Sequence, residues 1–80
     1  MNCQILLNDI KNVIKIKKLA YLVILRVDSD RPSSKVRLFI HNQLKKLESI
    51  RNQLRFANVE DTKANLKRLV KLNNYVRKNF

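Results

Sequence analysis

The chain has 80 residues, 18 of them Lys or Arg and 6 of them Asp or Glu, so its formal net charge at neutral pH is +12. The excess of positive charge is spread along the chain as +3 over residues 1–32, +5 over 33–58 and +4 over 59–80. Like charges in a compact domain repel each other, so a polyanion bound to this protein would stabilise it. Glycine is absent, which excludes standard phosphate-binding loops, dinucleotide fingerprints and EF-hand loops, because these need its backbone freedom.

The first 28 residues predict one helical element or two. Asn8 and Asp9 are able to start a helix that continues through Ile10, Val13 and Ile14. Residues 19–25 are a continuous apolar run, for which periodicity alone does not separate a buried helix from a strand. We favour a helix because the chain has no second strand-like run to pair with, and a strand at 19–27 is the alternative. The run is shorter than the ~20 apolar residues of a membrane span, so we do not expect a membrane partner.

A break in the pattern lies at residues 29–34, Ser-Asp-Arg-Pro-Ser-Ser. Proline disfavours helical geometry at Arg31, and Ser33 and Ser34 are good N-cap residues. We therefore expect a linker here and a second helix over about 34–57. Its apolar positions follow two heptad lines with one polar interruption at Gln43, which Leu44 is placed to cover. The first line holds Val36, Gln43, Ile50 and Ala57, and the second holds Ile40, Leu47 and Leu54.

The last helix is predicted over about 60–79. Two new heptad lines appear here, and the step from Leu54 to Thr62 does not continue the earlier register, which indicates a turn at 57–61. Asn58 is the expected N-cap, with Asp61 three residues on as in a capping box. The new lines hold Val59, Leu66, Asn73 and Phe80, and Thr62, Leu69 and Val76. The prediction is a small all-α protein of one domain, residues 1–80, made of an N-terminal segment 1–28, a linker 29–34 and an antiparallel helix hairpin 34–80.

The cations of the hairpin are the candidate nucleic-acid-binding residues. Lys63, Lys67, Lys71 and Lys78 follow spacings of four, four and seven, so they form one ridge on the last helix, where like charges repel. No acid follows Asp61, which favours a phosphate-binding ridge over a merely solvated face. The predicted set is Lys45, Lys46, Arg51, Arg55, Lys63, Lys67, Arg68, Lys71, Arg77 and Lys78. Few aromatics accompany them: Phe39 and Phe80 are expected in the core or an interface, and His41 at the surface.

No catalytic or metal set is evident. One Cys and one His do not supply the three or four ligands of a zinc site, and one Cys forms no intramolecular disulfide. The carboxylates are scattered, and no Ser or Thr has a suitable base beside it. We therefore expect no enzyme activity and no cofactor. The lone Cys favours a reducing, intracellular compartment.

The segment from Leu44 to Phe80 resembles the helical hairpin of the universal ribosomal large-subunit protein of the twenty-nine family. In that family a first helix ends in a Leu-Arg pair, as at Leu54-Arg55, and a basic helix follows a short loop. Residues 66–71, Leu-Lys-Arg-Leu-Val-Lys, and 76–78, Val-Arg-Lys, are similar to that second helix in kind. The resemblance implies ribosomal RNA binding through the basic face of the second helix, and residues 1–33 have no counterpart in the family.

The preferred hypothesis is a non-catalytic protein that binds structured RNA as a ribosomal component beside neighbouring proteins of a large assembly. Asn, Lys and Ile, which A- and T-rich codons encode, are abundant, so an organelle such as the mitochondrion or plastid is a candidate location. A DNA-binding or nucleoid protein is one alternative, although the acids Glu60 and Asp61 do not suit the start of a recognition helix. A protein–protein adaptor that uses its apolar stripes is the other.

Overall fold

The computed structural model describes residues 2–27 and 34–80, and in these ranges it contains three helices and no strand. They are α1 (Cys3–Val27), α2 (Ser34–Leu54) and α3 (Lys63–Asn79). The all-α prediction is confirmed. The strand alternative for residues 19–27 is wrong, because one uninterrupted helix runs through the whole apolar run. This helix begins at Cys3, before the predicted start at Asn8. Of the predicted linker, residues 29–33 lie outside the described part of the chain.

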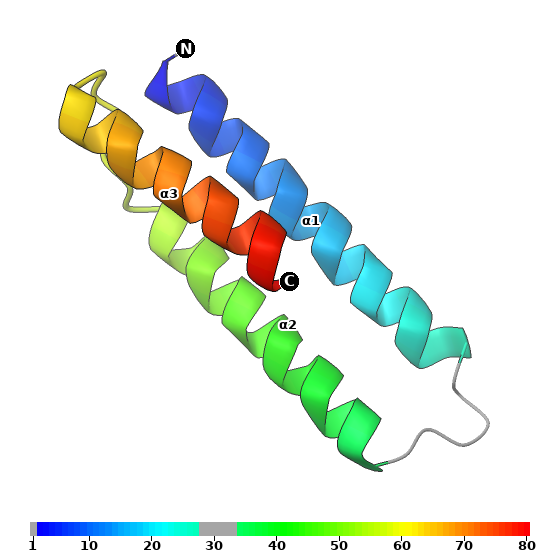
Figure 1. Cartoon of the computed structure of the whole chain (residues 1–80). Coiled ribbons are helices and arrows are strands. Elements are labelled where there is room, and N and C mark those ends of the chain that lie inside the picture. Colours follow the sequence, from blue (N-terminus) through cyan, green and yellow to red (C-terminus); the bar gives the residue numbers. More distant parts are fainter. Residues whose placement is uncertain (1, 28–33) are drawn as a thin grey trace.

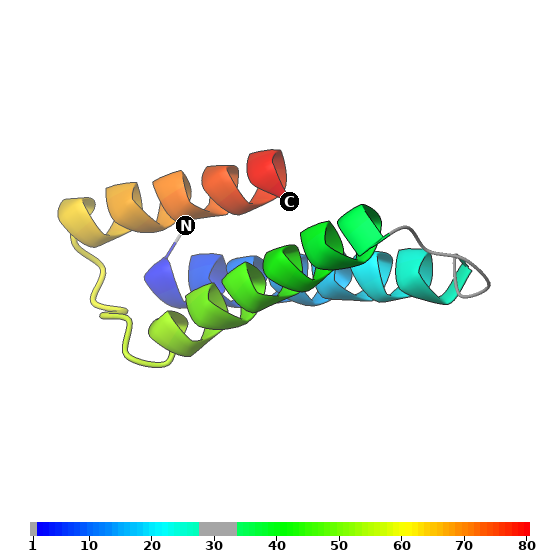
Figure 2. The ribbon, with the colours of Figure 1, turned by 90° about the horizontal axis from the view of Figure 1, so that it is seen from below.

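The three helices form an elongated molecule with principal extents of 49 × 20 × 15 Å. α1 and α2 are antiparallel neighbours, and α3 lies across one side of this pair (Figures 1 and 2). The predicted hairpin of α2 and α3 is present as two antiparallel helices, but its packing differs from the prediction. α1 packs against both helices, whereas no Cα of α2 comes within 8 Å of a Cα of α3. The N-terminal helix is therefore the central helix of the fold.

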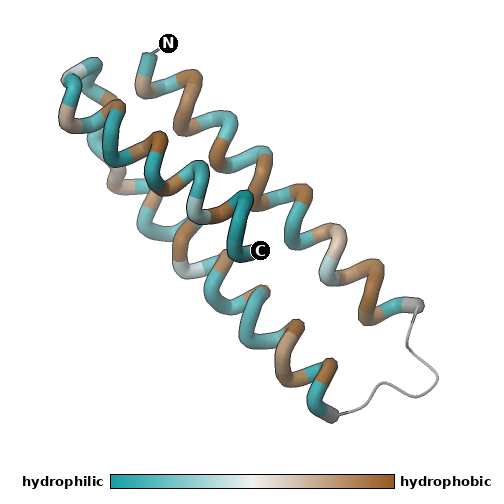
Figure 3. Tube along the Cα trace, in the orientation of Figure 1, coloured by the Kyte–Doolittle hydropathy of each residue, from teal (hydrophilic) through white to brown (hydrophobic). Residues whose placement is uncertain are grey.

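One hydrophobic core joins all three helices. The predicted stripes of α2 and α3 supply Ile40, Leu47, Leu54, Leu69 and Val76, each buried. Most of the core comes from α1, whose buried residues recur at helical spacing along one face. These are Cys3, Leu6, Leu7, Ile10, Val13, Ile14 and Tyr21. Figure 3 shows the apolar positions of the three helices along their length.

The polar interruption in the α2 stripe is a buried junction between the helices. Gln43 is only 9% exposed, and its Nε2 donates to the hydroxyl of Tyr21 at 3.2 Å and to the carbonyl of Asn79 at 3.4 Å. The Tyr21 hydroxyl donates in turn to the carbonyl of Phe80 at 3.0 Å. These bonds satisfy buried polar groups and fix the C-terminal end of α3 over α1 and α2.

The connection between α2 and α3 differs from the predicted turn in its capping. α2 ends at Leu54, and α3 begins only at Lys63, with Thr62 as its N-cap. The Thr62 hydroxyl accepts from the Asn65 amide at 3.1 Å, while Asn58 accepts from the Glu60 amide at 2.9 Å and so caps a turn rather than a helix. The predicted N-cap at Asn58 is therefore wrong.

Asp61 caps a different helix from the one predicted. Its Oδ1 accepts from the amide of Cys3 at 2.8 Å, and the Cys3 thiol donates to the Glu60 carbonyl at 3.3 Å. A first-turn amide has no partner within its own helix, so this carboxylate satisfies an orphan donor of α1. Burial, followed by the Asp61 carboxylate, raises the pKa of the Cys3 thiol.

Candidate nucleic-acid interface

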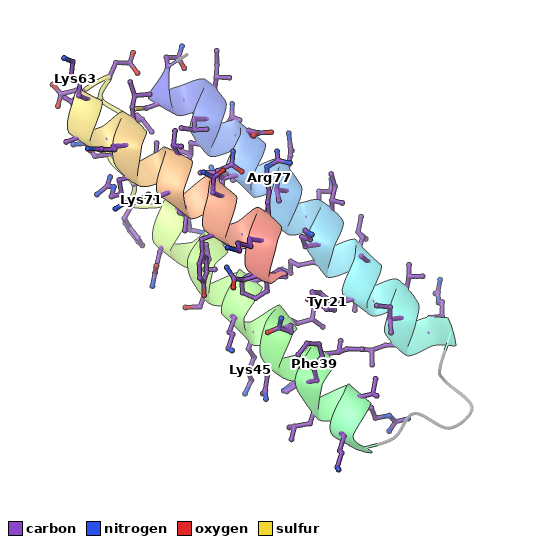
Figure 4. The ribbon with its side chains drawn as sticks, in the orientation of Figure 1. Tyr21, Phe39, Lys45, Lys63, Lys71 and Arg77 are labelled. Carbon is purple, nitrogen blue, oxygen red and sulfur yellow. The ribbon has the colours of Figure 1, made fainter. Side chains whose placement is uncertain are left out.

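The lysine ridge of α3 lies on the side of the helix opposite the core. Leu69 and Val76 are 1% and 0% exposed on the core side, and a helix turns by about 100° per residue, so the ridge faces outward. All four ridge residues, Lys63, Lys67, Lys71 and Lys78, are exposed. Figure 4 shows Lys63 and Lys71 projecting from the outer side of the helix. The ridge is thus presented to solvent as predicted.

The ridge has no neutralising carboxylate on its own helix, because α3 contains no Asp or Glu. Two ion pairs occur among the described residues, Lys18 with Glu48 and Arg77 with Asp9. Neither involves a ridge lysine. Lys63 also lies in the first turn of α3, where a cation opposes the helix dipole. The ridge therefore concentrates positive charge at a cost in stability that a bound anion would offset.

Arg77 has a structural partner that the sequence did not indicate. Its Nη2 lies 3.2 Å from Oδ2 of Asp9 on α1, and its Nε donates to Oδ1 of Asn73 at 3.0 Å. Asn73 completes the set by donating to the same Asp9 oxygen at 3.0 Å. These bonds hold α3 against α1. They also explain why the apolar stripe of α3 contains the polar residue Asn73. Phosphate contact by Arg77 stays a prediction, and it would compete with the Asp9 carboxylate.

The other predicted cations come from α3, from α2 and from the residue that follows α2. Arg68 on α3, Lys45, Lys46 and Arg51 on α2, and Arg55 just after the end of α2 are all exposed. Arg51, however, lies in a hollow between α2 and α1, whereas Lys45 lies beside Asn52 and Phe56 in a hollow on α2. The predicted set is therefore distributed over α3, α2 and the residue after α2, with Lys45 and Arg51 in two different hollows.

A cationic hollow between α1 and α2 was missed by the sequence reasoning. It has a volume of about 380 Å³, and its cations are Lys11, Lys15, Lys18 and Arg51. Lys18 is paired with Glu48, and the hydrogen bond from Lys18 lowers the pKa of that carboxyl. The α1 lysines are spaced by four and three residues, which places them on one face of the helix. This spacing could have predicted the cationic hollow. This hollow is a second candidate position for a phosphate.

The aromatic residues do not form a platform for stacked bases. Tyr21 is buried, and Phe80 is half-buried with its ring edge-on to Tyr75 at a centroid distance of 6.0 Å. Phe80 packs against the core as expected, whereas Phe39 is 57% exposed, so of the two predicted positions, core or interface, it does not occupy the core. His41 is exposed, as predicted. Recognition through several stacked bases is therefore not favoured.

No protein-family model, no curated protein and no solved structure matches this chain. Among the described residues, no group of three or more His, Cys, Asp or Glu side chains is placed to hold a metal ion. In residues 2–27 and 34–80, no helix is both long enough and apolar enough to span a membrane.

Proposed function

We propose that this protein binds structured RNA through the lysine ridge of α3, without catalysis. The observation that carries the proposal is the acid-free, exposed row Lys63, Lys67, Lys71 and Lys78 on a helix whose other face is buried. Lysines that contact phosphates release condensed counterions, and this release favours binding independently of base sequence. Specificity then comes from the shape of the folded RNA.

The separation of cationic surfaces supports folded RNA over a simple extended strand. The ridge lies on α3, while the hollow with Lys11, Lys15 and Arg51 lies between α1 and α2. A compact RNA brings phosphates from several directions around a small protein, so both surfaces are usable at once. This is the situation of a component inside a ribonucleoprotein, and a ribosomal large-subunit role, as the sequence resemblance implies, is the specific form of the proposal.

The salt dependence of RNA affinity tests the proposal. If about six to eight side chains contact phosphates, log K falls with log salt at a slope of roughly −5 to −7. The double variant Lys67→Gln with Lys71→Gln removes two central ridge charges and should reduce that slope by about 2 and weaken binding by about tenfold or more. Binding is measured by fluorescence anisotropy against a structured RNA hairpin and a DNA duplex of the same sequence.

The matched control removes the same net charge from the other end of the molecule. Lys35 and Arg37 are exposed in the first turn of α2, so Lys35→Gln with Arg37→Gln lowers the net charge equally. Equal losses in the two double variants would show that only net charge matters, which would refute a role for the ridge. Tighter binding to the duplex than to the RNA would favour the DNA-binding alternative. Purification from cells at low salt, with and without nuclease, should show RNA in the untreated sample only.

A further inference from the structure

α1 carries apolar side chains on two faces. Ile16, Leu19 and Val23 are 64%, 54% and 57% exposed. At about 100° per residue these three lie within about 60° of one another around the helix, and Leu19 lies about 180° from the buried Ile10. Figure 1 shows α2 and α3 on one side of α1, so the outer face of α1 has neither helix over it. An exposed apolar face of this kind indicates contact with another molecule.

The cationic hollow between α1 and α2 adjoins this outer face. Leu19 and Leu22 line the hollow together with its cations, which are Lys11, Lys15, Lys18 and Arg51. A second hollow of about 370 Å³ is lined by the same two leucines, by Val23 and by Arg26. Leu19 and Leu22 therefore join a cationic surface to an apolar one.

The cations of the hollow are only partly neutralised. None of the described residues that line either hollow is an acid. Glu48 on α2 is paired with Lys18. Lys11, Lys15 and Arg51 form no ion pair within residues 2–27 and 34–80. Three positive charges are therefore left for an external anion.

Two acids follow α1 in the sequence, Asp28 and Asp30, and both lie outside the described residues. Residues 10–30 contain five cations and these two acids, so the net charge of the segment is still +3. Lys18 lies nine residues before the end of α1 at Val27, ~14 Å along the helix. We therefore place the anion at the hollow, and not at Arg26, which is next but one to Asp28.

A ligand that satisfies both parts of this surface joins a phosphate to an apolar chain. Nucleic acid supplies phosphates but leaves the leucines exposed to water, and a second copy of this chain brings another +12. An acidic protein would need a groove shaped to the convex face of a single helix. A bilayer deforms around such a face, and basic pockets between helices bind lipid head groups. Anionic phospholipid therefore fits this surface best.

We propose that the outer face of α1 binds the surface of an anionic phospholipid bilayer, with phosphates at Lys11, Lys15 and Arg51 and with Leu19 and Leu22 at the acyl boundary. The helix lies on the bilayer and does not cross it. The expectation of no membrane partner came from the length of the apolar run, which bears on spanning alone. The inference does not depend on RNA binding, since the lysine ridge belongs to α3.

The apolar part is tested by co-sedimentation of the full chain with vesicles. One set is an equimolar mixture of phosphatidylglycerol and phosphatidylcholine, and the other is phosphatidylcholine alone. We expect binding to the first set to be at least about tenfold tighter. Leu19→Asn should weaken it about fivefold or more, whereas Leu38→Asn, at a 61% exposed site that lines neither hollow, should change it less than about twofold. Leu22→Asn repeats the test should Leu19→Asn disturb the fold, and circular dichroism at 222 nm should show all three variants equally helical.

The cationic part is tested by two double variants that remove the same charge. Lys11→Gln with Lys15→Gln changes the hollow and should weaken vesicle binding about tenfold or more. Lys67→Gln with Lys71→Gln changes the ridge and should change it less than about threefold. Binding to the structured RNA hairpin, measured alongside, reports on the proposed function separately.

Four results would overturn the lipid proposal. The first is an equal loss in the two double variants or in Leu19→Asn and Leu38→Asn. The second is equal binding to the two sets of vesicles. The third is a loss of RNA binding without a loss of vesicle binding in the Lys11 and Lys15 double variant. The fourth is Leu19-dependent dimerisation, or Leu19-dependent binding to an acidic amphipathic peptide, without vesicle binding.

Discussion

Replacing Tyr21 with Phe should destabilise this protein measurably, although it removes a single oxygen. The Tyr21 hydroxyl is the centre of the junction that holds the end of α3, because it donates to the Phe80 carbonyl at 3.0 Å and accepts from Gln43 Nε2 at 3.2 Å. The phenyl ring would keep its contacts with the core. Only the two hydrogen bonds would be lost, which isolates their contribution.

The expected magnitude follows from the number of bonds and the burial of the groups left behind. A hydrogen bond contributes about 0.5–1.5 kcal/mol net, and a buried group left without its partner costs about 1–3 kcal/mol. Gln43 keeps its bond to Asn79, so its amide is not fully orphaned. We therefore expect Tyr21→Phe to cost about 1–2 kcal/mol, out of a total stability of roughly 4–12 kcal/mol for a domain of this length.

Replacing Gln43 with Leu should cost much less, since the two changes are not equivalent. Gln43 is the donor to Tyr21, so its removal leaves the Tyr21 hydroxyl still bonded to Phe80, while an apolar side chain fills the buried position. Gln43 also bonds the Asn79 carbonyl, but Asn79 is exposed, so water can replace Gln43 as the partner of that carbonyl. Gln43→Leu should therefore change the free energy of unfolding by less than about 0.5 kcal/mol.

Urea unfolding followed by circular dichroism at 222 nm measures both effects, with the slope m expected to stay constant. A loss of 1 kcal/mol lowers the thermal midpoint by about 4–8 °C in a domain of this size. Tyr75→Phe is the control, because Tyr75 is 50% exposed. A neutral Tyr21→Phe, or a Gln43→Leu as costly as Tyr21→Phe, would refute the role assigned to this junction.

Three other predictions concern the core, one ion pair and the thiol. Leu47 is 0% exposed, so Leu47→Ala should cost about 2–5 kcal/mol in urea unfolding, whereas Leu38→Ala at a 61% exposed site should cost under about 0.5 kcal/mol. Because Lys18 lowers the pKa of Glu48 from its ordinary 4.5, the stabilisation is present above that pH and is lost as pH falls through the lowered pKa. The difference in urea midpoint between the native chain and Glu48→Gln should accordingly shrink below pH 4.5, and a constant difference would contradict the pairing. The Cys3 thiol is buried with a raised pKa, so iodoacetamide should alkylate it about tenfold or more slowly than in urea, and equal rates would show that the end of α1 is open.

The helices of this protein were largely predictable because each depends on local pattern. Ile40, Leu47 and Leu54 recur at seven-residue spacing, and the helix that contains them buries all three. The outward position of the lysine ridge followed from the same periodicity. The turn chemistry was less predictable, since Asn58 and Thr62 are both good caps and the choice depends on where α3 meets α1.

The partners of individual side chains depended on contacts between residues far apart in the chain. Asp61 looked like part of a cap for its own helix, but its carboxylate bonds the amide of Cys3. Arg77 looked like a free cation, but Asp9 lies against it. Phe39 was expected in the core or an interface, and only the packing of the helices showed that it lies outside the core.

The sequence by itself determined a basic, all-helical chain with an acid-free lysine ridge, because charge and periodicity are properties of single elements. The tertiary structure alone decided that α1 is the central helix, that Arg77 pairs with Asp9 and that Asp61 bonds the amide of Cys3. These features depend on which helices pack together and in which register, and contacts between residues far apart in the chain set both.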